Sequence, residues 1–133
     1  MLFDFSFIIP AHTLQSAPFE GLAGLTRGRL TQIIMLFPPG PATLVHMAVR
    51  HSLHQLMPAN YDGDINFDDA IITSVLDYKL VDPPYEIRVL GWSEDAVYDH
   101  NITVQFNVEP NENEDWDAFN HTLFLLNNRT RDR

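Results

Sequence analysis

The residues best suited to chemistry lie in one acidic segment near the middle of the chain. Residues 62–69 have the sequence DGDINFDD, in which Asp62, Asp64, Asn66 and Asp68 alternate oxygen-bearing side chains. Such a loop can surround Ca²⁺, which takes about six to eight hard oxygen ligands. The glycine is misplaced for an EF-hand and the late bidentate glutamate is missing, so main-chain carbonyls would have to complete the set. An acidic turn leading into a strand explains the same pattern. We therefore expect no metal site, with calcium as the alternative.

Histidines are the next candidates, because His46, His51 and His54 lie close together in the sequence. Metal ligands on one face of a continuous strand must be an even number of residues apart, since successive side chains point to opposite faces. The separations are odd (51 − 46 = 5 and 54 − 51 = 3), so the spacing does not favour a metal site. Asp99 could orient His100, but no serine lies in the Gly-x-Ser-x-Gly turn of a hydrolase. We therefore expect neither enzymatic activity nor a cofactor.

Composition excludes several further classes of function. The chain has 8 Lys+Arg against 18 Asp+Glu, a formal net charge of −10. Nucleic acids and anionic membranes both attract basic surfaces, so neither is expected as a partner. The chain has no cysteine, which excludes disulfides, thiol nucleophiles and cysteine-based metal sites. There is also no Gly-x-x-x-x-Gly-Lys or Gly-x-Gly-x-x-Gly loop for phosphate binding.

The first ten residues are apolar, but they lack a basic start and include Asp4. This pattern favours a strand over a signal peptide. No run approaches the roughly 20 apolar residues of a membrane-spanning helix. The expected location is therefore a virion or the cytoplasm.

The dominant pattern of the chain is an alternation of apolar and polar residues. Phe3, Phe5, Phe7 and Ile9 point one way, and the same period of two recurs at residues 45–49, 72–80 and 102–108. This pattern is typical of strands with one face in a core and one in solvent. The expected core positions of the segment 72–80 are Ile72, Leu76, Tyr78 and Leu80, with Ser74 the one polar residue among them.

Residues 30–37 and 85–92 are apolar on both faces. Such segments are central strands, or strands whose outer face meets a partner chain. Proline clusters separate the strand-length segments, at residues 38–41, 58–64 and 82–84. Together these features predict an all-β fold, either a sandwich or a barrel, and we expect an antiparallel β-sandwich over residues 1–110. Residues 10–27 are irregular and glycine-rich, and we expect them to form a surface loop.

Residues 111–133 have a different pattern, with an acidic turn followed by apolar residues at helical spacing and then a basic tail. The apolar residues are Trp116, Phe119, Leu123 and Leu126, at separations of 3, 4 and 3. Such a stripe predicts a short amphipathic helix, for which Asn113 is a suitable N-cap. The helix would pack on its own sandwich or dock on a neighbouring subunit.

Three segments carry a resemblance to a known class of protein. Residues 25–30 (LTRGRL) open a strand, residues 37–41 (FPPGP) close it, and residues 83–92 (PPYEIRVLGW) precede the last strand. Over residues 1–110, this arrangement resembles the small jelly-roll sandwiches that coat or decorate viral capsids. The resemblance implies a symmetric homo-oligomer, often a trimer, that sits on a larger protein shell.

The function expected from these patterns is structural: assembly through protein–protein contacts, as a virion decoration or capsid-associated subunit. The expected interface residues are Phe3, Phe5, Trp116, Phe119, Leu123 and Leu126. One alternative is a carbohydrate-binding sandwich, with calcium in the segment 62–69 and a tryptophan or tyrosine stacked on sugar. Another is a small cupin-like enzyme that uses the histidines.

Overall fold

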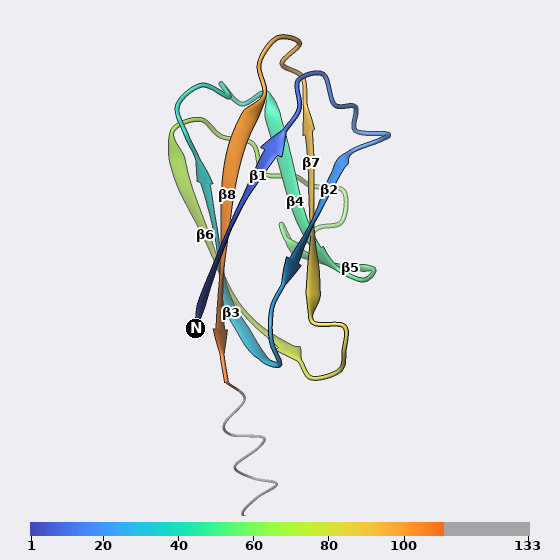
Figure 1. Cartoon of the computed structure of the whole chain (residues 1–133), viewed down its shortest axis with the longest axis vertical. Coiled ribbons are helices and arrows are strands. Elements are labelled where there is room, and N and C mark those ends of the chain that lie inside the picture. Colours follow the sequence, from blue (N-terminus) through green and yellow to red (C-terminus); the bar gives the residue numbers. More distant parts are fainter. Residues whose placement is uncertain (111–133) are drawn as a thin grey trace, which may run out of the picture.

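The alternating segments form antiparallel strands in the computed structural model of the chain, which describes residues 1–110 (Figure 1). The strands within this range are β1 (Leu2–Ile9), β2 (Phe19–Gly24), β3 (Gly28–Phe37), β4 (Val45–His51), β5 (His54–Met57), β6 (Ala70–Leu80), β7 (Glu86–Ser93) and β8 (His100–Glu109). Residues 111–133, including the predicted C-terminal helix, lie outside the described residues. None of the described residues belongs to a helix long and apolar enough to cross a membrane.

The strands form two four-stranded sheets that face each other (Figure 1). Sheet A has the order β1-β8-β3-β6, and sheet B has the order β2-β7-β4-β5. The pairings are nested along the chain, since β1 pairs with β8, β2 with β7, β3 with β6 and β4 with β5. A long hairpin folded over on itself in this way is a jelly roll. The all-β, jelly-roll-like sandwich predicted from the sequence is therefore confirmed.

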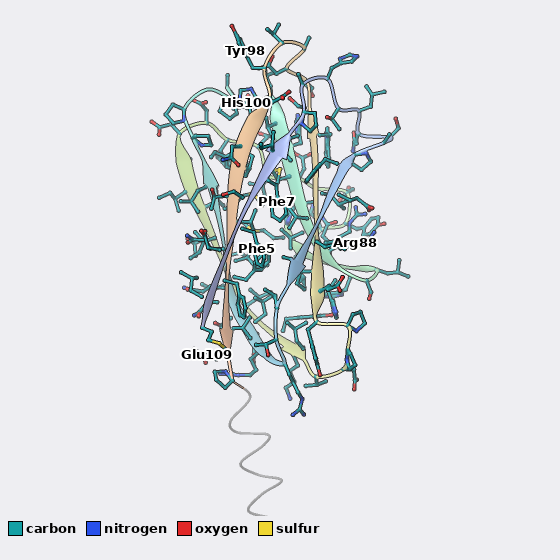
Figure 2. All side chains as sticks on the ribbon, viewed as in Figure 1. Phe5, Phe7, Arg88, Tyr98, His100 and Glu109 are labelled. Carbon is teal, nitrogen blue, oxygen red and sulfur yellow. The ribbon has the colours of Figure 1, made fainter. Side chains whose placement is uncertain are left out.

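The core lies between the sheets and is built from the apolar positions of the alternating strands. β1 shows this clearly, because Phe3, Phe5, Phe7 and Ile9 face the interior while the residues between them are exposed. Phe5 stacks on Phe7 and meets the edge of Phe106 of β8, with ring centroids 6.2 and 6.0 Å apart. Figure 2 shows Phe5 and Phe7 between the layers, with Arg88 on the outer side of β7.

The prediction of a surface loop over residues 10–27 is wrong for its second half, which forms β2. The inward positions of β2 are Phe19, Gly21 and Ala23. A Cβ at Gly21 would lie 2.4 Å from the ring of Phe7, so the aromatic ring occupies the space a larger residue would need. The strand was not predicted from the sequence because Gly21 and Ala23 are small, so the usual alternation of large apolar side chains is missing.

The short strand β5 was also not predicted, since it has only four residues. It pairs with β4 through the tight turn at Ser52, whose φ is 53°. The two segments that are apolar on both faces correspond to β3 and β7, and both strands are central in their sheets. Central position accounts for part of their apolar character. The outward residues of β3 nevertheless stay partly exposed.

Candidate functional site

The outer side of sheet A carries a group of partly exposed apolar side chains on β3 and β6. We call Ile34, Leu36, Ile71 and Val75 the apolar face. Leu36 pairs directly with Ile71 across the two strands, and Ile34 pairs with Thr73. Ile71 and Val75 are 67% and 77% exposed, while Ile34 and Leu36 are half-buried. Alternation alone would place polar residues at these outward positions.

A groove of about 600 Å³ continues the apolar face toward the end of the sandwich where β3 ends and β6 begins. Its lining comes from β3, β6, β8 and the adjoining loops: Leu36, Phe37, Pro38, Asp69, Ala70, Ile71, Asn101 and Thr103. Glu109 at the end of β8 lies at the opposite end of the molecule from His100 (Figure 2). The groove and the exit of the chain toward residue 111 therefore lie at opposite ends of sheet A.

The most concentrated polar chemistry lies on the outer side of sheet B, around His46 of β4. Its Nδ1 is 2.8 Å from an oxygen of Asp64, and its Nε2 is 3.0 Å from an oxygen of Glu94. The imidazole stacks on Trp92 of β7, with centroids 5.5 Å apart and planes only 5° from parallel. Asn66 donates to the same Asp64 oxygen at 2.8 Å. Each nitrogen of the imidazole therefore has a carboxylate partner.

This arrangement attaches the long connection between β5 and β6 to sheet B. Asp64 contacts His46, and Asn66 on the other side of Ile65 donates to Asp64. Ile65 itself exchanges main-chain hydrogen bonds of 2.9 and 2.8 Å with Met47. The two carboxylates that contact His46 lie at opposite nitrogens of its ring. They therefore do not converge on a shared point where an ion could sit.

The four calcium candidates do not meet at one position. Asp64 and Asn66 are brought together at His46, whereas Asp68 accepts hydrogen bonds from the backbone N–H groups of Gly40 and Ala42 at 2.9 and 2.8 Å. Asp62 accepts a longer bond, of 3.2 Å, from the amide of Asn60. Among residues 1–110, no three histidine or acidic side chains are grouped in a way that could hold a metal ion.

A pocket of about 340 Å³ lies next to the His46 cluster. One side is formed by residues 92–94 at the end of β7, and the other by residues 12–15. β2 begins opposite Gly91, so no strand pairs with Trp92 on that side and the loop takes its place. Trp92 thus has His46 on one side and this pocket on the other.

The other clustered histidines serve a different contact. His51 Nδ1 is 2.6 Å from the hydroxyl of Tyr78, and the ring of His54 stacks on Tyr78 with centroids 5.3 Å apart. Tyr78 comes from β6, an edge strand of sheet A, so these contacts link the two sheets at that edge. Burial raises the pKa of the Tyr78 hydroxyl above its usual value. The three histidines close in sequence therefore lie in two separate groups.

The proposed pairing of Asp99 with His100 is wrong. His100 Nε2 contacts Asp95 at 2.8 Å, while Asp99 accepts a hydrogen bond from the backbone N–H of Ala11. The hydrogen bond with His100 lowers the pKa of Asp95, and bonds from the backbone N–H groups of Val97 and Tyr98 lower it further. Asp99 cannot orient the His100 ring because adjacent side chains at the start of a strand point in opposite directions. Asp95 organises the β7–β8 loop.

Of the predicted interface residues, the structure places Phe3 and Phe5 inside their own sandwich, where their half-buried rings pack against the core. The others lie outside the described residues: Trp116, Phe119, Leu123 and Leu126. Sequence reasoning did not single out Glu94 or the pocket. A signal was present, because Trp92 and Glu94 are two residues apart at the end of β7, a spacing that places extended-chain side chains on one side. Their partner His46, however, depends on strand pairing that the sequence does not reveal.

Comparisons with known proteins add no relative: no protein-family model matches the chain, and neither a curated protein nor a solved structure is similar to it.

Proposed function

We propose that this protein is a structural subunit that assembles with copies of itself, with the apolar face as a contact surface. The observation that carries this proposal is the exposure of Ile71 and Val75, at 67% and 77%, beside the half-buried Ile34 and Leu36. An uncovered apolar sheet face favours association, because contact with a partner removes it from water. A closed oligomer uses such a surface without unlimited aggregation.

The edges of the sandwich support the same role. β6 has eleven residues, forms one edge of sheet A and contains no proline. Long unprotected edge strands are sites where another chain can pair. The apolar face and this edge are adjacent, so one partner could cover both.

The finer proposal is a homo-oligomer, such as a trimer, that decorates a larger protein shell. Support comes from the strand order, since viral capsid domains are among those built as jelly rolls. The sequence after residue 110 supplies further apolar side chains for contacts between copies, namely Trp116, Phe119, Leu123 and Leu126. The net charge of −10 would keep unassembled copies soluble.

The experiment is to measure the mass of the full chain by light scattering over a range of concentrations. We expect an oligomer in the unmodified protein, and a shift to monomer in the double variant Ile71→Asp with Val75→Asp. The matched control is Leu22→Asp with Leu53→Asp, since these residues are 60% and 85% exposed but lie on sheet B and its hairpin. Exposed substitutions of this kind change folding stability by only about 0.5 kcal/mol. A monomer at every concentration, or equal effects of both double variants, would contradict the proposal.

A further inference from the structure

The pocket beside Trp92 has one wall that main-chain contacts hold in place. The backbone N–H of Ser93 donates to the carbonyl of Thr13 at 2.9 Å, and that of His12 donates to the carbonyl of Asp95 at 2.7 Å. The Thr13 hydroxyl donates to the carbonyl of Pro10 at 2.6 Å. His12 has a φ of 57°, a conformation that non-glycine residues seldom adopt without such support. The wall is therefore formed before any ligand arrives.

The opposite wall combines a flat ring with an oriented carboxylate. Trp92 has one side stacked against His46, so its remaining side borders the pocket. One carboxylate oxygen of Glu94 contacts His46 Nε2 at 3.0 Å, which positions an otherwise exposed acid at the rim. Preorganisation of this kind reduces the entropy that binding would cost.

We propose that this pocket binds a neutral saccharide. The ring of Trp92 offers an apolar surface for the C–H face of a sugar, as aromatic residues with a polar neighbour commonly do. Glu94 can accept hydrogen bonds from sugar hydroxyls, and the amide of Gln15 can both donate and accept. The lining contains no lysine or arginine, which disfavours an anionic ligand. The volume of about 340 Å³ is at the small end of ligand pockets, so one sugar ring or the end of a glycan fits.

This site is independent of the proposed assembly surface. The pocket lies between the end of β7 in sheet B and residues 12–15, whereas the apolar face lies on β3 and β6 of sheet A. Assembly through sheet A would leave the pocket open in every copy. Several weak sites on one oligomer would act together and raise the avidity for a glycan surface.

The test is a titration of the full chain with methyl glycosides of glucose, galactose, mannose and N-acetylglucosamine, followed by NMR and tryptophan fluorescence. The chain has two tryptophans, so Trp116→Phe leaves Trp92 as the only one. A ligand of about a dozen non-hydrogen atoms reaches a Kd in the millimolar range at ordinary ligand efficiency. We expect at least one sugar to bind in this range and to shift the signals of residues 12–15 and 92–94.

Variants assign the binding to the pocket. Glu94→Gln keeps the shape of the side chain but removes its charge, and we expect the affinity to fall about tenfold or more. Glu20→Gln is the matched control, because Glu20 also lies on the outer side of sheet B but pairs with Arg88 outside the pocket. Trp92→Ala should abolish binding while the NMR spectrum stays that of a folded sandwich.

Three results would overturn the proposal. One is the absence of any shift at residues 12–15 and 92–94 with all four glycosides. Another is a response of the pocket to choline but not to sugars, which would make it a site for organic cations. Binding that survives both Glu94→Gln and Trp92→Ala would also refute it, since the sugar would then bind elsewhere. None of these results depends on the oligomeric state.

Discussion

The substitution Gly91→Ala tests how the two sheets meet. Gly91 of β7 faces inward, and a Cβ there would lie 2.6 Å from Ile9 Cδ1 of β1 and 2.9 Å from Met47 Sδ of β4. Both neighbours are fully buried, so neither can move into solvent. Overfilling a packed core by such a group costs about 1–3 kcal/mol. The glycine in a strand already costs about 0.5–1 kcal/mol relative to alanine, so we expect a net loss of about 0–2.5 kcal/mol.

Gly24→Ala supplies the matched control, because a Cβ at Gly24 meets no atom within 4 Å. It carries the same change of backbone entropy without the clash, so the two variants should differ by about 1–3 kcal/mol. For a domain of this size the difference corresponds to about 4–12 °C in Tm, which calorimetry or circular dichroism resolves.

A second substitution checks the cause of the loss. Ile9→Val removes the Cδ1 atom that the new methyl group of Gly91→Ala would contact, so the double variant should be more stable than the sum of the single effects. Equal Tm values for Gly91→Ala and Gly24→Ala would refute the packing of β1 over β7. Additive effects in the double variant would show that Ile9 is not the neighbour that matters.

Three further outcomes follow from single polar groups. Asp68→Ala should lower the free energy of unfolding in urea by about 1–2 kcal/mol, because Asp68 binds the backbone of the loop at Ala42, whose φ is 50°. Asp95→Asn should make the free energy of unfolding depend less on pH in acid. Because the pKa of Asp95 is lowered in the folded protein, its carboxylate contributes stability above pH 3.8, the ordinary pKa, and this stability is lost as the pH falls through the folded pKa. Breaking the contact by His100→Ala should have the same effect on the pH profile. Burial raises the pKa of Tyr78, so one of the four tyrosines should ionise last in an ultraviolet titration, and Tyr78→Phe should remove that phase. Stability contributed by this group is present below its ordinary pKa of 10.0 and is lost as pH rises through the folded value.

The fold was predictable where each strand repeats large apolar residues at every second position. In β1, β6 and β8 the sequence alternation matches the burial pattern along the strand. It was not predictable in β2, because the Phe7 ring fills the space over Gly21 and the alternation there depends on another strand. The alternation within a strand shows which of its sides is buried. Which strand it pairs with depends on residues far away in the sequence.

The candidate sites show the same limit. The acidic segment around Asp64 was identified from sequence as a place for chemistry, but its contact with His46 comes from eighteen residues earlier in the chain. The odd separation of His46 and His51 predicted that they would not share a strand face, and in the structure they contact different partners. The spacing of residues within one strand could not show that Trp92 pairs with His46, because that pairing depends on the register of β4 against β7.

The two candidate surfaces both follow from how far the strands of the nested hairpin pair with each other. Pairing stops early between β2 and β7 but runs almost the full length of β3 and β6. β2 has six residues against the eight of β7, so Trp92 and Ser93 extend beyond it and residues 12–15 close the gap as a loop. A pocket forms where strand pairing stops. In sheet A, β3 and β6 have ten and eleven residues and pair along almost their whole length, which forms a continuous outer face. A strand pair that ends early, such as β2 and β7, therefore favours a small-molecule site. A strand pair that continues along the sheet, such as β3 and β6, favours a flat contact between proteins.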